Sequence, residues 1–218
     1  MDPAVGIDDA VARIGAHPGR AGMVEAPGVE ARPDVGILLH GDLHPAEAET
    51  PQFLHFIAGM QKHLPAAIAL LAPYVNSYRR YVPDFAAPIN LEWGRDNRTT
   101  GLRVPISSPE ARRVENRLAG MDCNPYLGIA ASLACGYLGL VEGENPRGEC
   151  LGDAYMSSQD ELPYNLGDAL DMMAENTPMR GVLGEDFTAV YESVKRNEYK
   201  EFLQVISPWE REHLLLNV

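Results

Sequence analysis

Positive charge is concentrated between residues 79 and 117 of an otherwise acidic chain. This window holds eight arginines and five acidic residues, a net charge of +3, whereas the 218-residue chain carries −13 at pH 7. The arginines are Arg79, Arg80, Arg95, Arg98, Arg103, Arg112, Arg113 and Arg117. Arginine keeps its charge and offers a planar fork of donors that suits carboxylates and phosphates. The window is therefore predicted to bind anionic groups.

Residues 111–117 alternate as a β-strand does, which predicts that Arg113, Glu115 and Arg117 point to one face. An acid between two arginines fits a buried anion site, or a metal ligand flanked by anion clamps. It equally fits a solvent-facing ladder of ion pairs, because most charges on strands lie on the surface. The spacing alone leaves these alternatives open.

The composition narrows the class of protein. A hydrophobic fraction of 45% and a charged fraction of 22% are ordinary for a globular chain of one large or two small domains. The acidic balance argues against nucleic acid or an anionic membrane as the main partner. Cys123, Cys135 and Cys150 lack metal-binding spacing and are expected to be reduced thiols. We find no apolar run of membrane-spanning length and no signal segment, so a cytoplasmic protein is expected.

Residues 1–51 differ from the rest because they are rich in Gly, Pro and Ala. A short helix over Asp8–Ile14 and a strand over Val35–Leu39 are the elements expected there. His40 and His44 resemble a metal-binding pair only superficially, and an exposed polar turn is the favoured interpretation.

Apolar residues recur at helical spacing over Gln52–Ala72, which predicts the first strong helix. Pro65 is expected to kink or divide it. Two strands are predicted over Ile89–Trp93 and Gly101–Val104. The intervening turn, Gly94–Thr100, would place Arg98 at a strand mouth.

Helices dominate the remainder of the chain. Asn124 and Pro125 are typical of a helix start, and small residues up to about Leu140 indicate close packing. A loop-rich stretch over Val141–Tyr164 follows. Further helices are predicted over Leu166–Glu175 and Asp186–Ile206, with a final helix opened by the capping box of residues 207–210.

The Asp186–Ile206 helix is expected to bury one apolar side and to expose its basic residues. The apolar side consists of Phe187, Val190, Tyr191, Val194, Phe202, Leu203 and Ile206. The basic residues are Lys195, Arg196 and Lys200. The predicted fold class is α+β, with a sheet that carries the arginines and is backed by helices.

Short motifs run in one order through residues 76–126. They are NSYRR at 76–80, VP at 82–83, AP at 87–88, NR at 97–98, RVP at 103–105, ARRVENR at 111–117 and NPY at 124–126. This combination closely resembles the C-terminal catalytic part of the glutamine synthetase family. The resemblance begins near His55 and covers about three quarters of the chain. It implies that residues 52–218 form part of a glutamine synthetase-like catalytic domain, incomplete here, preceded by the atypical segment 1–51.

The family joins the side-chain carboxylate of glutamate to ammonia or another amine, with ATP and Mg²⁺ or Mn²⁺, through γ-glutamyl phosphate. By resemblance, Arg80 and Arg117 bind the substrate, and Arg98 is a catalytic residue that faces the transferred phosphate. Arg98, Arg103 and Arg113 resemble the ATP-binding positions. Glu115 resembles a metal ligand, a hard oxygen donor suited to these cations.

Two departures from the family pattern stand out. Ala86 occupies the position where strict glutamine synthetases carry a flap glutamate, with Asp84 as a weak substitute. This resembles the branch that uses larger amines, such as gamma-glutamylputrescine synthetase. The other metal ligands of the family are not found, and one glutamate is a poor site for a cation that takes about six oxygens.

Three hypotheses result. The first is a ligase acting on glutamate and an amine, without nucleic acid or membrane partners, whose intact relatives form homo-oligomers. The second is a truncated, catalytically inactive relative with an interaction or regulatory role. The third is a simple anion-binding domain, which needs only the arginines.

Overall fold

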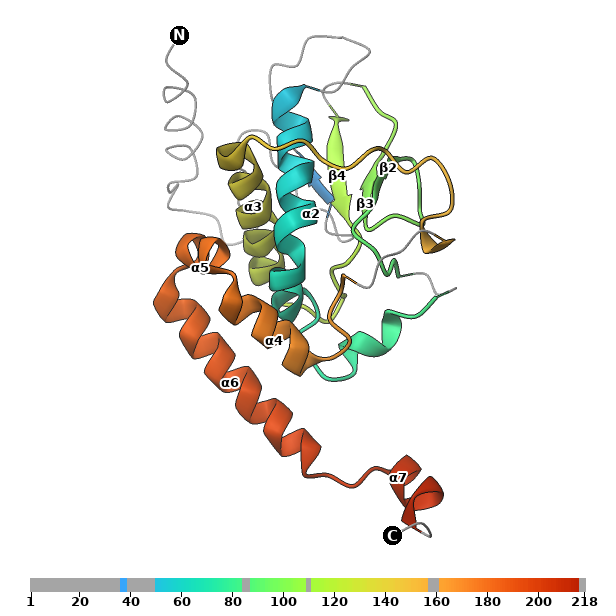
Figure 1. The fold of residues 1–218 in the computed structure, drawn as a ribbon, viewed down its shortest axis with the longest axis vertical. Coiled ribbons are helices and arrows are strands. Elements are labelled where there is room, and N and C mark those ends of the chain that lie inside the picture. The colour runs from blue at the N-terminus through green and yellow to red at the C-terminus, as the bar shows by residue number, and fades with distance from the viewer. Residues whose placement is uncertain (1–35, 39–49, 84–86, 109–110, 157–160, 216–218) are drawn as a thin grey trace, which may run out of the picture.

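The computed structural model describes residues 36–38, 50–83, 87–108, 111–156 and 161–215. The predictions for Asp8–Ile14, His40, His44, Asp84 and Ala86 fall outside these residues. Within them, a small sheet lies on one side of a long central helix and further helices lie on the other, which confirms the α+β class (Figure 1).

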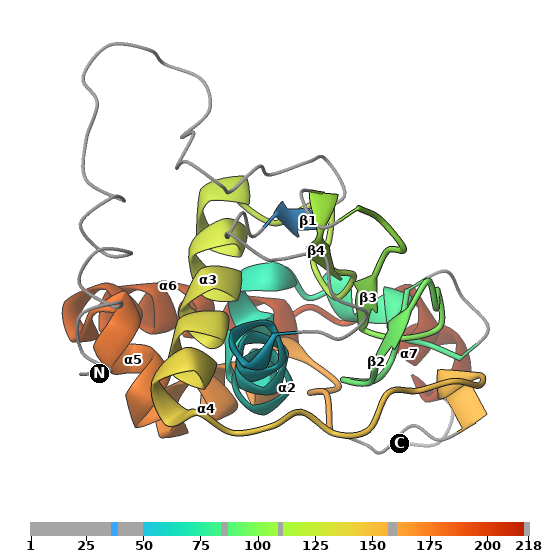
Figure 2. The same cartoon turned by 90° about the horizontal axis from the view of Figure 1, so that it is seen from above.

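Helix α2 (Pro51–Leu71) is the centre of the fold. Thr50 Oγ1 caps it by accepting a hydrogen bond from Phe53 N at 3.3 Å, and Pro51 occupies its start. The view from above shows α2 end-on between the sheet and the helices α3 (Pro125–Glu142) and α4 (Leu166–Glu175) (Figure 2). Its largest fully buried side chains are Ile57, Met60, Leu64, Ile68, Leu70 and Leu71.

Pro65 does not divide α2, which continues to Leu71 as a single helix. A proline in a helix interior removes one backbone hydrogen bond at a cost of about 3 kcal/mol. The residues on either side of Pro65, Leu64 and Ala66, are buried, and this burial offsets that cost.

Glycines allow α2 and α3 to approach closely. A Cβ added to Gly59 would lie 2.3 Å from Cys135 O and 2.4 Å from Gly139 N. A Cβ added to Gly139 would lie 2.1 Å from His55 O. Gly136 of α3 likewise receives the ring of Phe56 from α2. The small residues predicted to pack closely therefore do so against the central helix.

By length and composition alone, α3 is apolar enough to cross a membrane, and 44% of it is buried inside the fold. The expectation that no apolar run reaches this length was wrong for α3. The physical reason is its place in the core, since a helix packed along α2 needs apolar residues without needing a membrane. Asn124 Oδ1 caps it as predicted, accepting from Tyr126 N at 3.0 Å, and Gly143 in the left-handed region ends it.

Within the described residues, the sheet has four short strands in the order β1-β4-β3-β2. They are β1 (Gly36–Leu38), β2 (Trp93–Arg95), β3 (Leu102–Val104) and β4 (Arg113–Asn116). β4 pairs antiparallel with β1 and β3, whereas β3 pairs parallel with β2. β1 lies within the predicted strand at Val35–Leu39.

The strand predicted over Ile89–Trp93 begins later, at Trp93. Asn90 explains the shift, because its Oδ1 accepts hydrogen bonds from Glu92 N and Gly101 N, both at 3.1 Å. These side-chain bonds tie the backbone at Glu92 and Gly101 to Asn90, so residues 90–92 precede the regular strand. The connection to β3 then starts at Asp96, which adopts a positive φ of 51°.

A buried histidine joins three helices. His63 of α2 lies 3.2 Å from Glu142 of α3 through Nε2, and 3.2 Å from Asn176 Nδ2 through Nδ1. Asn176 Oδ1 already accepts from Met179 N to cap α5 (Thr177–Leu183), so its Nδ2 must face His63. His63 Nδ1 therefore accepts from Asn176, and Nε2 is the nitrogen that donates to Glu142.

The C-terminal helices lie close to their predicted residue ranges, but one of them buries a different side from the one predicted. α4 occupies the predicted range, and α7 (Pro208–His213) opens with the predicted capping box of Ser207 and Glu210. α5 was missed. Its signal was present in Asn176 and Pro178, a helix cap followed by a first-turn proline.

Helix α6 (Glu185–Leu203) exposes the side that was predicted to be buried. Six of the residues predicted to form the apolar side are 36% to 65% exposed. Five lie on α6, namely Phe187, Val190, Val194, Phe202 and Leu203, and Ile206 follows its end. The helix instead packs through Thr188, Tyr191 and Lys195. Lys195 Nζ lies 4.6 Å from the ring centroid of Tyr74, so the prediction of a solvent-facing lysine was wrong.

The glycine contact between α2 and α3 gives a direct test of the packing. We expect Gly139→Ala to lower the free energy of unfolding by about 1–3 kcal/mol or more, because the new methyl group meets backbone that cannot move aside. Gly181→Ala is the matched control, since the helical Gly181 has nothing within 4 Å of its added Cβ. That change should be neutral or stabilise by roughly 0.5–1 kcal/mol. Equal effects in urea denaturation would contradict the close contact.

Candidate active site

A buried carboxylate stands at the centre of the arginine-bearing sheet. Arg103 on β3 lies directly across from Glu115 on β4. Arg103 Nη1 is 2.7 Å from Glu115 Oε2, and Arg113 Nη2 is 3.4 Å from Glu115 Oε1. The Glu115 side chain is only 8% exposed. Of the alternatives left open by the spacing, the solvent-facing ladder is therefore wrong, and Glu115 is a buried counter-ion.

The arginines that flank Glu115 differ from those predicted. Arg113 is one of them, but the other is Arg103 of the neighbouring strand, whereas Arg117 lies beyond the end of β4. Alternation along one strand could not reveal a partner supplied by another strand. The register Arg103↔Glu115 supplies it.

Arg103 is held as a charged residue between two carboxylates. Burial lowers its pKa, but hydrogen bonds to Glu115 and Asp96 outweigh that effect and the pKa is raised. Asp96 forms an ion pair with Arg103 Nη2 from the other side. The contact between Asp96 and Arg103 was not predicted. The Nε of Arg103 is buried without a hydrogen-bond partner among the described residues.

Arg117 connects the sheet to the loop that carries Arg98. Its Nη1 donates to the carbonyl of Arg98 and lies 3.4 Å from that of Thr100. Burial lowers the pKa of Arg117, and the charges of Arg103 and Arg98 lower it further, against opposing effects from Tyr155 and Glu115. Arg98, Arg103 and Arg117 are thus close enough for their charges to repel. An anion among them would relieve that repulsion.

Arg98 is exposed, and its guanidinium makes no hydrogen bond or ion pair within the described part of the chain. Its backbone carbonyl is engaged by Arg117, so the residue is tied at the main chain and open at the side chain. A held backbone and an exposed guanidinium suit a residue that binds an external anion.

Arg80 is the one predicted site residue that has no contact with this group among the described residues. Its Nη2 donates to the carbonyl of Leu118 and lies 3.1 Å from Tyr81 Oη, and its guanidinium stacks 4.6 Å from the Tyr81 ring centroid. The structure therefore places Arg98, Arg103, Arg113, Glu115 and Arg117 in one cluster and Arg80 beside it, across Leu118.

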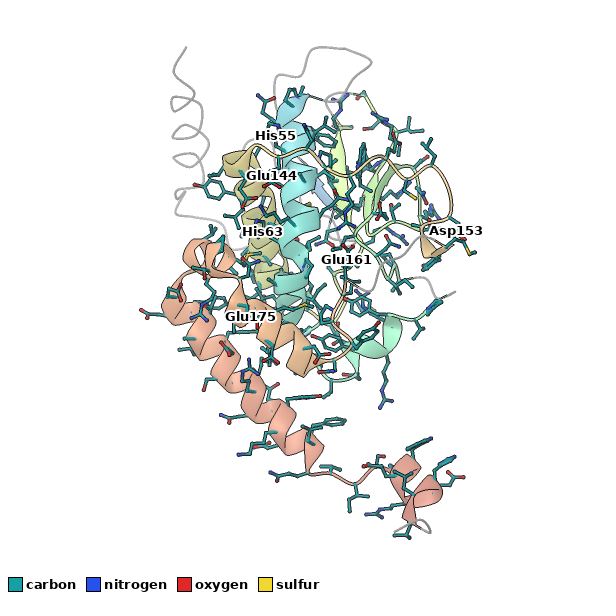
Figure 3. All side chains as sticks on the ribbon, viewed as in Figure 1. His55, His63, Glu144, Asp153, Glu161 and Glu175 are labelled. Carbon is teal, nitrogen blue, oxygen red and sulfur yellow. The ribbon has the colours of Figure 1, made fainter. Side chains whose placement is uncertain are left out.

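The described residues do not fit a divalent metal site by themselves. They contain no group of three or more His, Cys, Asp or Glu that could hold a metal ion. Figure 3 shows labelled histidines and acids spread from α2 to the 3₁₀ helix at Ala154–Met156. Both oxygens of Glu115, the predicted metal ligand, already face arginines.

The three cysteines are free thiols, as predicted. Burial raises the pKa of the Cys123 thiol, with a further contribution from Asp122, and burial raises that of Cys135 strongly. Neither is therefore suited to act as a nucleophile at neutral pH.

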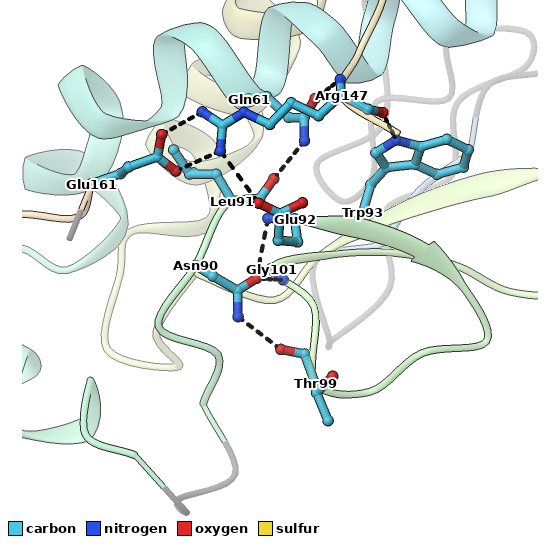
Figure 4. Close-up of polar contacts among 9 residues, drawn as sticks. All are labelled: Gln61, Asn90, Leu91, Glu92, Trp93, Thr99, Gly101, Arg147 and Glu161. Atoms are coloured by element: carbon cyan, nitrogen blue, oxygen red, sulfur yellow. Dashed lines mark hydrogen bonds and ion pairs between the residues drawn. The ribbon is translucent and has the colours of Figure 1, made fainter. Parts of the chain in front are cut away.

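A polar network fixes the sheet against α2 (Figure 4). Gln61 of α2 donates to Leu91 O at 2.9 Å and accepts from Arg147 N at 3.0 Å. Arg147 also forms ion pairs with Glu161 and Glu92. The segment after α3 is thereby bound to both the central helix and the edge of the sheet.

Comparison with known proteins agrees with this architecture. Residues 38–214 match the family model described as glutamine synthetase, catalytic domain. The chain therefore belongs to the glutamine synthetase family, as its motifs predicted.

Relatives include both glutamine synthetases and enzymes named for larger amines. The chain is 40% identical over 177 residues to the gamma-glutamylputrescine synthetase of Escherichia coli, covering 80% of this chain and 37% of the relative. It is 39% identical to a glutamine synthetase of Archaeoglobus fulgidus, covering 72% and 34%. It is 35% identical to the gamma-glutamylethanolamide synthetase of Streptomyces coelicolor, again covering 72% and 34%. The chain spans about a third of the length of these relatives.

The structure is also similar to a solved one. The ligand-free form of GmaS superposes with a TM-score of 0.69 at 28% identity, covering 83% of this chain and 43% of that one. The fold of the described residues is thus that of part of a family member.

Removal of the central carboxylate tests its part as counter-ion. We expect Glu115→Ala to lower the free energy of unfolding by about 3 kcal/mol, because Arg113 loses its carboxylate partner and Arg103 keeps only Asp96, while both guanidinium groups stay largely shielded from water. Asp171→Ala, which breaks the exposed pair with Arg196, should cost less than about 1 kcal/mol. Thermal and urea unfolding would measure both. Similar losses would show that Glu115 is not a buried counter-ion.

Proposed function

We propose that this chain forms the arginine-lined part of the active site of an ATP-dependent ligase that joins the side-chain carboxylate of glutamate to an amine. Family membership supports the class of reaction. The observation that carries the proposal is the cluster of Arg98, Arg103, Arg113 and Arg117 around buried Glu115, with the Arg98 guanidinium open to an anion.

The proposed reaction places negative charge where these arginines stand. A glutamate carboxylate oxygen attacks the terminal phosphorus of ATP, the bond to ADP breaks, and γ-glutamyl phosphate forms. The amine nitrogen then attacks the acyl carbon, phosphate leaves with the electron pair of its bond to that carbon, and the amine loses a proton. Both steps increase charge on phosphoryl oxygens, which fixed cations stabilise.

Each arginine has a proposed part. Arg98 faces the transferred phosphate, while Arg103 and Arg113 contact the phosphates of the nucleotide. Arg117 and Arg80 hold the glutamate substrate. Arg80 has to release its contact with Leu118 O, or use its remaining donors, to reach the substrate.

The family implies Mg²⁺ or Mn²⁺ with ATP, and Glu115 is the residue proposed to contact the metal. The described residues do not complete such a site. Because Glu115 is already paired with Arg103 and Arg113, we assign no step of the reaction to a metal held by this part of the chain.

The proposed amine is larger than ammonia. Ala86 carries this inference, since alanine can neither take a proton from ammonium nor attract a cation. The names of two relatives, a gamma-glutamylputrescine synthetase and a gamma-glutamylethanolamide synthetase, are consistent with such a substrate. Homo-oligomerisation of the intact protein and a cytoplasmic location belong to the same proposal.

A chimera tests the amine preference. Residues 38–214 would replace the aligned segment of the Escherichia coli gamma-glutamylputrescine synthetase. We expect glutamate-dependent phosphate release with putrescine and much less with ammonia, because the transplanted segment carries Ala86 in place of a flap glutamate. Ala86→Glu in the chimera should shift the ratio toward ammonia. Equal or faster turnover of the unmodified chimera with ammonia would remove the proposal of a larger amine.

A non-catalytic interaction role is the second candidate. Exposed apolar side chains on α6, on α7 and on the segment between them favour a surface that contacts another protein. They include Leu203, Ile206 and Trp209. This role predicts neither ATP binding nor dependence on Arg98.

Binding of ATP by the 218-residue chain separates the candidates. We expect no ligase turnover, because the described residues supply no metal site, but weak ATP binding that fades as salt rises. Arg98→Gln should weaken binding about tenfold, whereas Arg79→Gln, an equal change of charge on the 3₁₀ helix Ser77–Arg80, should have little effect.

Calorimetry at low and high salt and a phosphate-release assay with glutamate, amine and Mg²⁺ would measure these outcomes. Equal effects of the two arginine changes would indicate general attraction to a basic surface. Robust glutamate-dependent phosphate release from this chain would show that metal ligands lie outside the described residues.

A further inference from the structure

Asn97, the residue before Arg98, uses its whole side-chain amide to hold the loop in place. Its Nδ2 donates to Cys150 O at 3.1 Å and to Gly152 O at 2.8 Å. Its Oδ1 accepts from Thr99 N at 3.0 Å and from Thr99 Oγ1 at 2.7 Å. A side-chain amide has two donor hydrogens and two acceptor lone pairs, and all four are used here. The first two bonds reach a segment more than fifty residues later in the chain.

Thr99, the residue after Arg98, is fixed in the same way. Ala154 N donates to Thr99 Oγ1 at 2.9 Å, and Asn90 Nδ2 donates to Thr99 O at 3.0 Å. Figure 4 shows the contact between Asn90 and Thr99 below the network of Arg147. Both neighbours of Arg98 are thus anchored, while its own guanidinium has no partner among the described residues.

The segment that Asn97 and Thr99 contact, residues Arg147–Ala154, is here called the brace. The brace is itself held by β2, because Trp93 Nε1 donates to Arg147 O at 2.6 Å and Cys150 N donates to Trp93 O at 2.8 Å. Ion pairs of Arg147 with Glu161 and Glu92 fix its beginning. The loop around Arg98 therefore rests on a support that is anchored independently of it.

We propose that Asn97 is a positioning residue for Arg98, and that the brace sets where the Arg98 guanidinium stands relative to the transferred phosphate. This inference rests on the proposed function of Arg98. A long exposed side chain stabilises charge well only when its backbone is held, because a loop displaced by about 1 Å loses much of the gain from orientation. The hydrogen bonds of Asn97 and Thr99, the residues on either side of Arg98, restrain the backbone without contacting the anion.

A double-mutant cycle on ATP binding by the 218-residue chain tests the proposal. We expect Asn97→Ala to weaken binding about tenfold, close to the effect of Arg98→Gln, because Arg98 loses its orientation. The double variant should then bind no more weakly than Arg98→Gln alone. Asn145→Ala, a change at an exposed asparagine just before the brace, is the control and should leave affinity unchanged. Losses that simply add in the double variant would overturn the proposal.

Thr99 provides a conservative pair in case Asn97→Ala disturbs folding. Thr99→Ser keeps the hydroxyl that meets Ala154 N and Asn97 Oδ1, whereas Thr99→Val keeps the shape and removes it. Serine should retain near-native ATP affinity and valine should lose about as much as Asn97→Ala. Equal affinities of the two variants would contradict a positioning role for these bonds.

Amide hydrogen exchange tests, in the absence of ATP, whether Asn97 holds the loop against the brace. In Asn97→Ala, exchange at Ala154 should accelerate about tenfold or more, while exchange within α2 stays unchanged. Unchanged exchange at Ala154 would overturn the inference even if ATP binds. If Arg98→Gln leaves ATP binding unaltered while Asn97→Ala accelerates exchange at Ala154, the proposed function of Arg98 is wrong but the support of its loop by the brace is confirmed. If Arg98→Gln weakens ATP binding and Asn97→Ala does not, the positioning role of Asn97 is wrong and the proposed function of Arg98 is retained.

Discussion

The close contact of α2 with α3 is the constraint on which the rest of the structure depends. Gly59 and Gly139 bring the two backbones within reach of each other, and the opposite side of α2 is then free to receive the sheet. Because most of α2 is buried between these layers, it fixes the distance between the helical layer and β4. Glu115 and its arginines consequently stand on a rigid element, although the strands themselves are only three or four residues long.

The sequence was most informative where local chemistry decides the structure. Helix starts at Asn124 and Ser207 were predicted because a capping side chain acts within three residues. The start of β2 was not, because Asn90 bonds to Gly101 across the turn. The orientation of α6 also escaped prediction, since its periodicity identifies an apolar side but not what, if anything, covers it.

The candidate site shows the same division. Motifs picked out Arg98, Arg103, Arg113, Glu115 and Arg117, and the structure brings them together. Their roles remain proposals. The partners that shape the cluster come from distant parts of the chain, and no spacing rule connects Asn97 with Cys150 or Arg103 with Glu115. Long-range contacts of this kind depend on strand register and on loops whose course the sequence does not state.

The hydrogen bond between Cys150 N and Trp93 O affects whether another chain can pair with the edge of the sheet. Among the described strands, β2 is the outer one at its end of the sheet, and an outer strand offers unpaired backbone groups to another extended chain. Here the carbonyl of Trp93 is already occupied, and the close approach of Cys150 O to Gly94 leaves 2.7 Å for an added Cβ. The segment that supports Arg98 therefore also occupies backbone groups of this edge strand that a further strand would need for pairing.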